Sequence, residues 1–158
     1  IVTLLGIFLI ILFLSYFLVD SSTRTAIFSI LAGSRITNNT LQLDSSTRLI
    51  FNNKSLATLN MLYDSNLERE FKACLKGRKV DNTYFIDETI QPETFRQEYN
   101  MVVSRPCPED TLVDLHSHPF KHCIPSQVDI ENFNRFKNNN KNALLAIMCD
   151  KNLFLFYK

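Results

Sequence analysis

The sequence has few glycines and prolines and no excess of charge of either sign. Three glycines and five prolines in 158 residues, with an apolar fraction of 46%, exclude collagen-like, low-complexity and disordered chains. Seventeen basic side chains are balanced by sixteen acidic ones, so the net charge of +1 gives no general attraction for nucleic acid. Four cysteines without regular spacing are too few for a disulfide scaffold. We therefore predict a globular chain with one main domain.

Charge is entirely missing from the first 19 residues, which are apolar with few interruptions. A helix of this length, at about 1.5 Å per residue, approaches the roughly 30 Å hydrocarbon thickness of a bilayer. A secretory signal peptide is one alternative, but the residues before Asp20 form a poor cleavage site. A buried core helix is another. We expect residues 1–19 to form a transmembrane helix and the protein to be a single-pass membrane protein.

Residues 20–44 are rich in serine, threonine and asparagine, which is typical of a linker. Residues 20–48 contain three arginines and two aspartates. This small excess of positive charge favours a cytosolic location for the C-terminal body. We interpret Cys74, Cys107 and Cys149 as buried thiols, which agrees with a reducing compartment. Residues 45–158 then form the main domain.

Strand and helix patterns alternate along this main domain. A helix begins near Ser55 and ends near residue 67, and a second helix spans residues 126–137. We expect Gly77 to interrupt the strand pattern that precedes it. Interleaved elements of both kinds predict an α/β or α+β fold, with a mixed sheet flanked by helices. The predicted strands are residues 48–52, 71–75, 83–90, 99–104, 111–115, 144–148 and 153–157.

All three histidines fall within seven residues. His116 and His118 follow the predicted strand of residues 111–115, and on a strand residues two apart point to the same side. If Ser126 begins a helix, Asp129 lies in its first turn and directs its carboxylate toward the strand end. Two imidazoles and a carboxylate leave one tetrahedral position open, which suits catalytic zinc better than structural zinc. The alternative is an ordinary capping box near surface histidines.

His-Ser-His-Pro followed after seven residues by Ser-x-x-Asp resembles the JAMM motif of MPN-domain metallopeptidases. This family includes zinc isopeptidases that remove ubiquitin or ubiquitin-like modifiers, and the bacterial RadC-like proteins have a similar pattern. The resemblance covers most of residues 45–158. It implies an MPN-type fold similar to that of cytidine deaminases, and one zinc ion per chain held by His116, His118 and Asp129.

The same family places a catalytic glutamate upstream, in a pattern E-x-x-G-x-L-x-G. Glu70, Leu75 and Gly77 stand in matching positions, while Ala73 replaces the first glycine. The competing carboxylates, Glu68 and Glu88, lack this offset. The resemblance therefore implies that Glu70 is the catalytic glutamate.

The implied reaction is hydrolysis of an amide by a zinc-activated water, whose pKa falls to about 7. Glu70 would accept the proton of this water and deliver it to the departing amine. Ser126 would donate a hydrogen bond to the oxyanion. Asp114 and Ser117 are both candidates for orienting the imidazoles. His122 and Cys123, between the two halves of the motif, receive no role.

The expected partners are a protein or peptide substrate, such as a ubiquitin-like conjugate joined by an isopeptide bond, and the membrane through the N-terminal helix. No nucleic-acid partner is expected. One alternative is a non-catalytic MPN scaffold, whose members usually lose metal ligands, whereas this chain keeps them. Another is a JAMM peptidase that acts on ordinary peptides.

Overall fold

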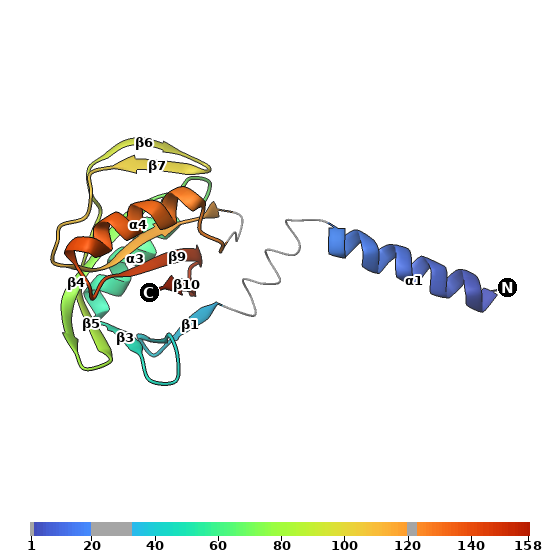
Figure 1. The fold of residues 1–158 in the computed structure, drawn as a ribbon, viewed down its shortest axis with the longest axis horizontal. Helices are drawn as coiled ribbons and strands as arrows, with labels where there is room; N and C mark the ends of the chain where they lie inside the picture. The colour runs from blue at the N-terminus through green and yellow to red at the C-terminus, as the bar shows by residue number, and fades with distance from the viewer. Residues whose placement is uncertain (1, 20–32, 120–122) are drawn as a thin grey trace.

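The fold comes from a computed structural model that describes residues 2–19, 33–119 and 123–158 (Figure 1). Eight strands of the body pair in the order β1-β10-β9-β8-β4-β5-β3-β2 and close into a ring. Two of the pairings, β3 with β5 and β8 with β9, are parallel, so the sheet is mixed as predicted. The strands are β1 (Ser34–Thr37), β2 (Thr40–Gln42), β3 (Arg48–Phe51), β4 (Lys72–Val80), β5 (Thr83–Ile90), β8 (Thr111–Ser117), β9 (Leu144–Asp150) and β10 (Leu153–Tyr157).

Two helices and a hairpin complete the body. The hairpin pairs β6 (Thr94–Glu98) with β7 (Met101–Ser104). Helix α3 (Asn53–Asp64) begins after Asn52, whose side chain accepts a 2.7 Å hydrogen bond from the Ser55 amide, so the N-cap is Asn52 and not Ser55. Helix α4 (Gln127–Asn139) begins after its predicted cap, Ser126. Both predicted helices are thus present, and α4 brings its first turn to the histidine strand.

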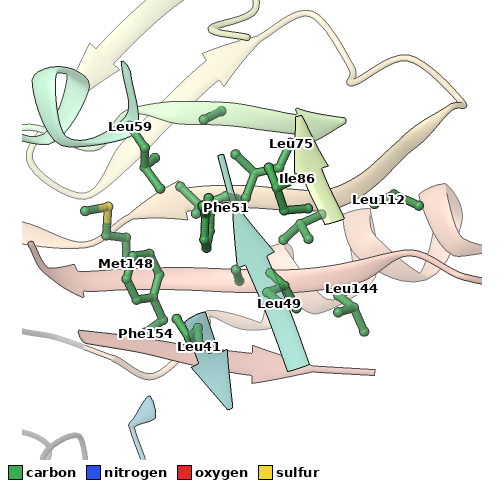
Figure 2. Close-up of a cluster of buried hydrophobic side chains, with 14 of the residues drawn as sticks. Leu41, Leu49, Phe51, Leu59, Leu75, Ile86, Leu112, Leu144, Met148 and Phe154 are labelled. Atoms are coloured by element: carbon green, nitrogen blue, oxygen red, sulfur yellow. The ribbon is translucent and has the colours of Figure 1, made fainter. Parts of the chain in front are cut away.

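The main hydrophobic core joins α3 to the sheet (Figure 2). Leu59 of α3, Phe51 of β3, Leu75 of β4 and Met148 of β9 are each at most 3% exposed. A second buried cluster packs Phe133 of α4 against side chains of β9 and β10. All seven residues of β8 are buried, although this strand includes polar side chains. Buried polar groups on a central strand need partners, so we expect the polar side chains of β8 to be bound by neighbouring groups.

Gly77 does not end its strand, because β4 continues to Val80. A Cβ at this position would collide with the backbone carbonyl oxygen of Phe85 on β5. The pairing of β4 with β5 also changes register between Lys76 and Gly77. Glycine is therefore required here for the close approach of two backbones, as is common where a strand contains a bulge.

The predicted linker, residues 20–44, differs from the structure over its C-terminal part. Strands β1 and β2 lie within it and both belong to the closed sheet. Asn38 and Asn39 form the turn between them, with φ of 50° and 59°. Left-handed backbone at two successive asparagines is typical of a two-residue hairpin turn. Residues 20–32 lie outside the described part of the chain.

Residues Val2–Val19 form helix α1, as predicted for their conformation. Within the described residues, no helix has the length and apolar character that crossing a membrane requires. The predicted transmembrane helix and the single-pass membrane localisation are therefore wrong.

The cysteines form disulfide bonds and are not thiols. Cys74 pairs with Cys107 and Cys123 pairs with Cys149, with Cα atoms 5.6 Å and 5.2 Å apart, both ordinary separations for a disulfide. The prediction of buried thiols is wrong, because the pairing depends on contacts between distant segments that the spacing does not reveal. Disulfides persist mainly in oxidising compartments. They therefore argue against the cytosolic location that the arginine excess favoured.

Candidate metal centre

Two histidines project from the central strand of the sheet toward one side. His116 lies in β8, and His118 follows the strand with its backbone amide donating to the Met148 carbonyl oxygen of β9 at 3.1 Å. Their ring centroids are 5.0 Å apart. His116 is 6% exposed and His118 is 8% exposed. The strand spacing thus brings both imidazoles to one buried point, as predicted. His122 lies outside the described residues.

Asp129 reaches the same point from the first turn of α4. Its Oδ2 lies 3.3 Å from His116 Nε2 and 3.7 Å from His118 Nε2. The same oxygen accepts a 2.7 Å hydrogen bond from the Ser126 amide, and Ser126 Oγ accepts one from the Asp129 amide at 3.2 Å. The capping box and the candidate ligand are therefore the same residues, because the cap holds the carboxylate toward the imidazoles.

The three side chains have the composition and spacing of a metal site. One ligand atom from each of His116, His118 and Asp129 lies within 4.8 Å of the others. Within the described structure, His116 Nε2 is buried and has no hydrogen-bond partner. A buried polar atom without a partner is costly, and a bound cation would satisfy it. Two imidazoles with one carboxylate suit zinc and leave a coordination position open, so the residues fit the predicted ion.

Glu70 lies beside these ligands, just before β4. Its Oε1 is 3.5 Å from His118 Nε2, and the residue is 8% exposed. Its backbone amide donates to the Glu98 carbonyl oxygen of the hairpin at 2.9 Å. The competing carboxylates are exposed, Glu68 before β4 and Glu88 on β5. Only Glu70 of the three is thus placed to act at the candidate metal centre.

Burial and charge shift the pKa values of the two carboxylates in opposite directions. For Glu70, burial is the main cause and raises the pKa to about 7, with a further rise from Asp129 and an opposing effect of His118. Burial also acts to raise the pKa of Asp129, but the nearby imidazoles of His116 and His118 outweigh it and hold the pKa below its usual range. Before a metal binds, Asp129 is therefore charged while Glu70 holds its proton more readily.

Ser117 and Asp114 have contacts that the sequence did not predict. Ser117 Oγ accepts from the Phe71 amide at 2.9 Å, and the Ser117 amide donates to the Phe71 carbonyl oxygen at 2.9 Å. These two bonds tie the segment that carries Glu70 to the histidine strand. Asp114 forms an ion pair with Lys72, with Oδ2 and Nζ 2.9 Å apart. No motif marked either contact, because both depend on the pairing of β4 with β8.

The candidate metal centre opens into a cleft of about 990 Å³. One face of β4 and β8 lines it, together with hairpin residues from Glu98 to Val102 and residues of α4 and the segment before it. The hairpin and α4 are labelled in Figure 1. Glu70, His116, His118, Ser126 and Asp129 all line this cleft. The candidate metal ligands thus open onto this cleft.

Comparison with known proteins gives little beyond a structural likeness. No family model matches the chain, and no curated protein is similar to it. Among solved structures, a JAB1/MPN domain protein from Archaeoglobus fulgidus is similar, with 23% identity and a TM-score of 0.44. That match covers 73% of this chain and 90% of the other. At this level of similarity, function has to be argued from the site itself.

Proposed function

We propose that the protein is a zinc-dependent peptidase that hydrolyses an amide bond in a protein or peptide substrate. The observation that carries this proposal is the meeting of four side chains from three separate segments. His116, His118 and Asp129 converge within 4.8 Å, and Glu70 approaches one of them to 3.5 Å. A metal ligand set with a neighbouring carboxylate is the arrangement that metal-assisted hydrolysis needs.

Two imidazoles and one carboxylate would hold the zinc ion: His116 and His118 through Nε2, and Asp129 through Oδ2. When bound, zinc supplies Lewis acidity that makes a water nucleophilic near neutral pH. The Glu70 carboxylate accepts a proton from the attacking water and returns it to the departing amine. Its burial and its raised pKa suit a group that must take up and release a proton near neutral pH.

Ser126 supplies a hydrogen-bond donor in the same place. Its Oγ already accepts from the Asp129 amide, and the hydroxyl hydrogen remains for donation. Ser126 lines the cleft and is exposed. We assign it to the substrate oxygen that becomes negative during attack, where one such donor contributes about 3 kcal/mol.

The cleft supports a polypeptide substrate. It lies between a hairpin and a helix, and apolar side chains such as Tyr99, Ile124 and Val128 line it beside the charged centre. The motif resemblance narrows the substrate further, to the isopeptide bond between a ubiquitin-like protein and a lysine. A scaffold without activity has no need for the full set of donors, which this chain retains.

The experiment combines metal content with cleavage. Purified protein with its disulfides intact is loaded with zinc, and its metal content is measured. Cleavage of a ubiquitin-like fusion and of a mixed peptide library is then compared with that of Glu70→Gln. Zinc-dependent cleavage that the substitution abolishes is expected. Well-folded protein that binds no zinc would overturn the proposal.

A further inference from the structure

We propose that Lys72, held by Asp114, forms a subsite in the cleft that binds a carboxylate of the substrate. The inference rests on the proposed function in one respect: the subsite is located relative to the bond that the candidate metal centre would cleave. Lys72 and Asp114 both line the cleft and lie outside the set that holds zinc or carries protons. No motif marks them, and their position follows from the pairing of β4 with β8.

Strand register places the pair next to the candidate metal centre. Lys72 is the direct partner of His116 in the antiparallel pairing of β4 with β8. Directly paired residues point to the same face, and Asp114 shares that face because it precedes His116 by two. Two residues along a strand correspond to about 7 Å. Because the Lys72 ammonium contacts Asp114 at 2.9 Å, it lies on the Asp114 side of His116 and is not one of the metal ligands.

Packing alone does not explain an ion pair at this buried position. Its side chains are only 19% and 8% exposed, and the cleft lining also includes Phe133 and Leu145. Leu145 of β9 is the direct register partner of Asp114. Replacing such a buried pair with apolar side chains is often neutral or stabilising. Charge at this position therefore points to recognition in the cleft.

The donors of Lys72 determine what the subsite can bind. An ammonium group carries three N–H donors, and the 2.9 Å contact with Asp114 uses one. Among the described residues that line the cleft, Lys72 is the single lysine or arginine, while four others are acidic. Among these lining residues, Lys72 is therefore the one cationic side chain that a substrate carboxylate can contact. Charged hydrogen bonds of this kind favour a matching group over a neutral one.

The spacing fixes where the substrate carboxylate lies. Each residue of an extended peptide advances about 3.3 Å, so the offset of about 7 Å between Asp114 and His116 corresponds to about two substrate residues. An acidic side chain or a free C-terminal carboxylate meets this requirement. Both sources present the same chemistry to Lys72, and the experiment separates them.

The test uses zinc-loaded protein and matched peptides that carry Asp or Asn at each of the two positions on either side of the cut bond. A second set has a free or an amidated C-terminus. We expect at least a tenfold higher kcat/KM for the carboxylate member of one set, which corresponds to about 1.4 kcal/mol. The set that shows this preference identifies the source of the carboxylate.

Lys72→Met/Asp114→Leu removes the pair without leaving a lone buried charge, and we expect it to abolish the preference. The matched control is Lys76→Met/Asp110→Asn, which removes an ion pair of the same strand that does not line the cleft. Lys72→Arg keeps the cation and should keep the preference. If the double variant does not fold, Lys72→Gln replaces it with the same expectation. Equal cleavage of both members of every peptide pair, or a preference that survives loss of Lys72, overturns the subsite.

Failure of the proposed function has a different signature, namely no cleavage of any peptide. Calorimetric titration then decides the subsite, with N-acetyl-aspartate amide and N-acetyl-asparagine amide as probes. Binding of the aspartate probe that disappears in Lys72→Met/Asp114→Leu supports the subsite. Equal binding by wild type and variant, or no binding, overturns it.

Discussion

The Glu70 carboxylate oxygen Oε1 lies 3.5 Å from His118 Nε2, although Glu70 comes just before β4 and His118 follows β8. Ser117 makes this possible, because its backbone and side chain both bind Phe71, the residue after Glu70. The candidate base and the candidate ligands are therefore joined by hydrogen bonds across β4 and β8. The pairing of β4 with β8 thus holds Glu70 beside the histidines, while the first turn of α4 supplies Asp129.

Glu70→Gln tests the role of this carboxylate. The amide keeps the size of the side chain but cannot accept and return a proton. We expect zinc content to stay at the wild-type level and the rate of amide cleavage to fall by about 10²-fold or more. Steady-state cleavage and metal analysis of the same samples provide the check. Glu68→Gln is the control, since Glu68 is exposed, and it should keep full activity.

Removal of a metal ligand should lower zinc affinity, whereas Glu70→Gln should leave zinc content unchanged. In Asp129→Asn the side chain retains its size but loses the charge that faces both imidazoles. We expect at least a tenfold weaker zinc affinity, measured by competition with a chelator. Chelation of wild-type protein should also lower its melting temperature, because zinc stabilises the state that binds it. Equal zinc affinity in Asp129→Asn would remove Asp129 from the ligand set.

The raised pKa of Glu70 predicts how the stability of zinc-free protein changes with pH. This carboxyl group has an ordinary pKa near 4.5 and a pKa of about 7 in the fold. Between these values the folded state binds more protons than the unfolded state, so the contribution to stability is lost as pH rises through 7. At pH 8, Glu70→Gln should therefore be more stable than wild type by about 3 kcal/mol.

Urea unfolding of zinc-free wild type and Glu70→Gln at pH 4 and pH 8 measures this difference. At pH 4 the two proteins should agree, because Glu70 is then protonated in both states. A difference that is the same at both pH values would show that the substitution acts through packing and not through the ionisation of Glu70.

The Cys123–Cys149 disulfide should support the metal centre as well as the fold. Cys123 precedes the α4 cap Ser126 by three residues, and Cys149 lies in β9, two residues after the register partner of His116. The bond thus joins the segment leading to Asp129 to the sheet that holds the histidines. We expect Cys123→Ala/Cys149→Ala to lower stability by about 3.5 kcal/mol and zinc affinity by about tenfold.

Cys74→Ala/Cys107→Ala is the matched control, because its sequence separation of 33 is close to the 26 of the other disulfide. Loss of chain entropy predicts a similar fall in stability for both variants. Zinc affinity should stay close to the wild-type value in the control. Equal loss of zinc affinity in both variants would assign the effect to general instability.

Local geometry explains why much of the candidate centre could be predicted from the sequence. His116 and His118 obey the two-residue period of a strand, and Ser126 with Asp129 obeys the spacing of a helix cap. Both rules act over a few residues and hold whatever the rest of the chain does. Glu70 is different, because residues alone did not select it among three carboxylates, and only the motif resemblance did.

Long-range pairing explains what sequence reasoning missed. The partners of the four cysteines, and the contact of Asp114 with Lys72, are decided by which strands lie side by side. Strands β1 and β2 are short and half exposed, so they lack the apolar alternation that marks a strand. The Asn38–Asn39 turn was the available signal, and it was hidden among other polar residues.

Gly77→Ala tests the other departure from the sequence prediction. Gly77 was expected to end a strand, but its missing side chain lets β4 approach the Phe85 backbone of β5. Since backbone atoms cannot move aside as a flexible side chain can, one methyl group should lower stability by at least about 2 kcal/mol. Glu88→Ala, an exposed change on β5, should cost less than about 1 kcal/mol. Urea unfolding of both variants makes the comparison, and equal small losses would show that the two strands can separate to admit a side chain.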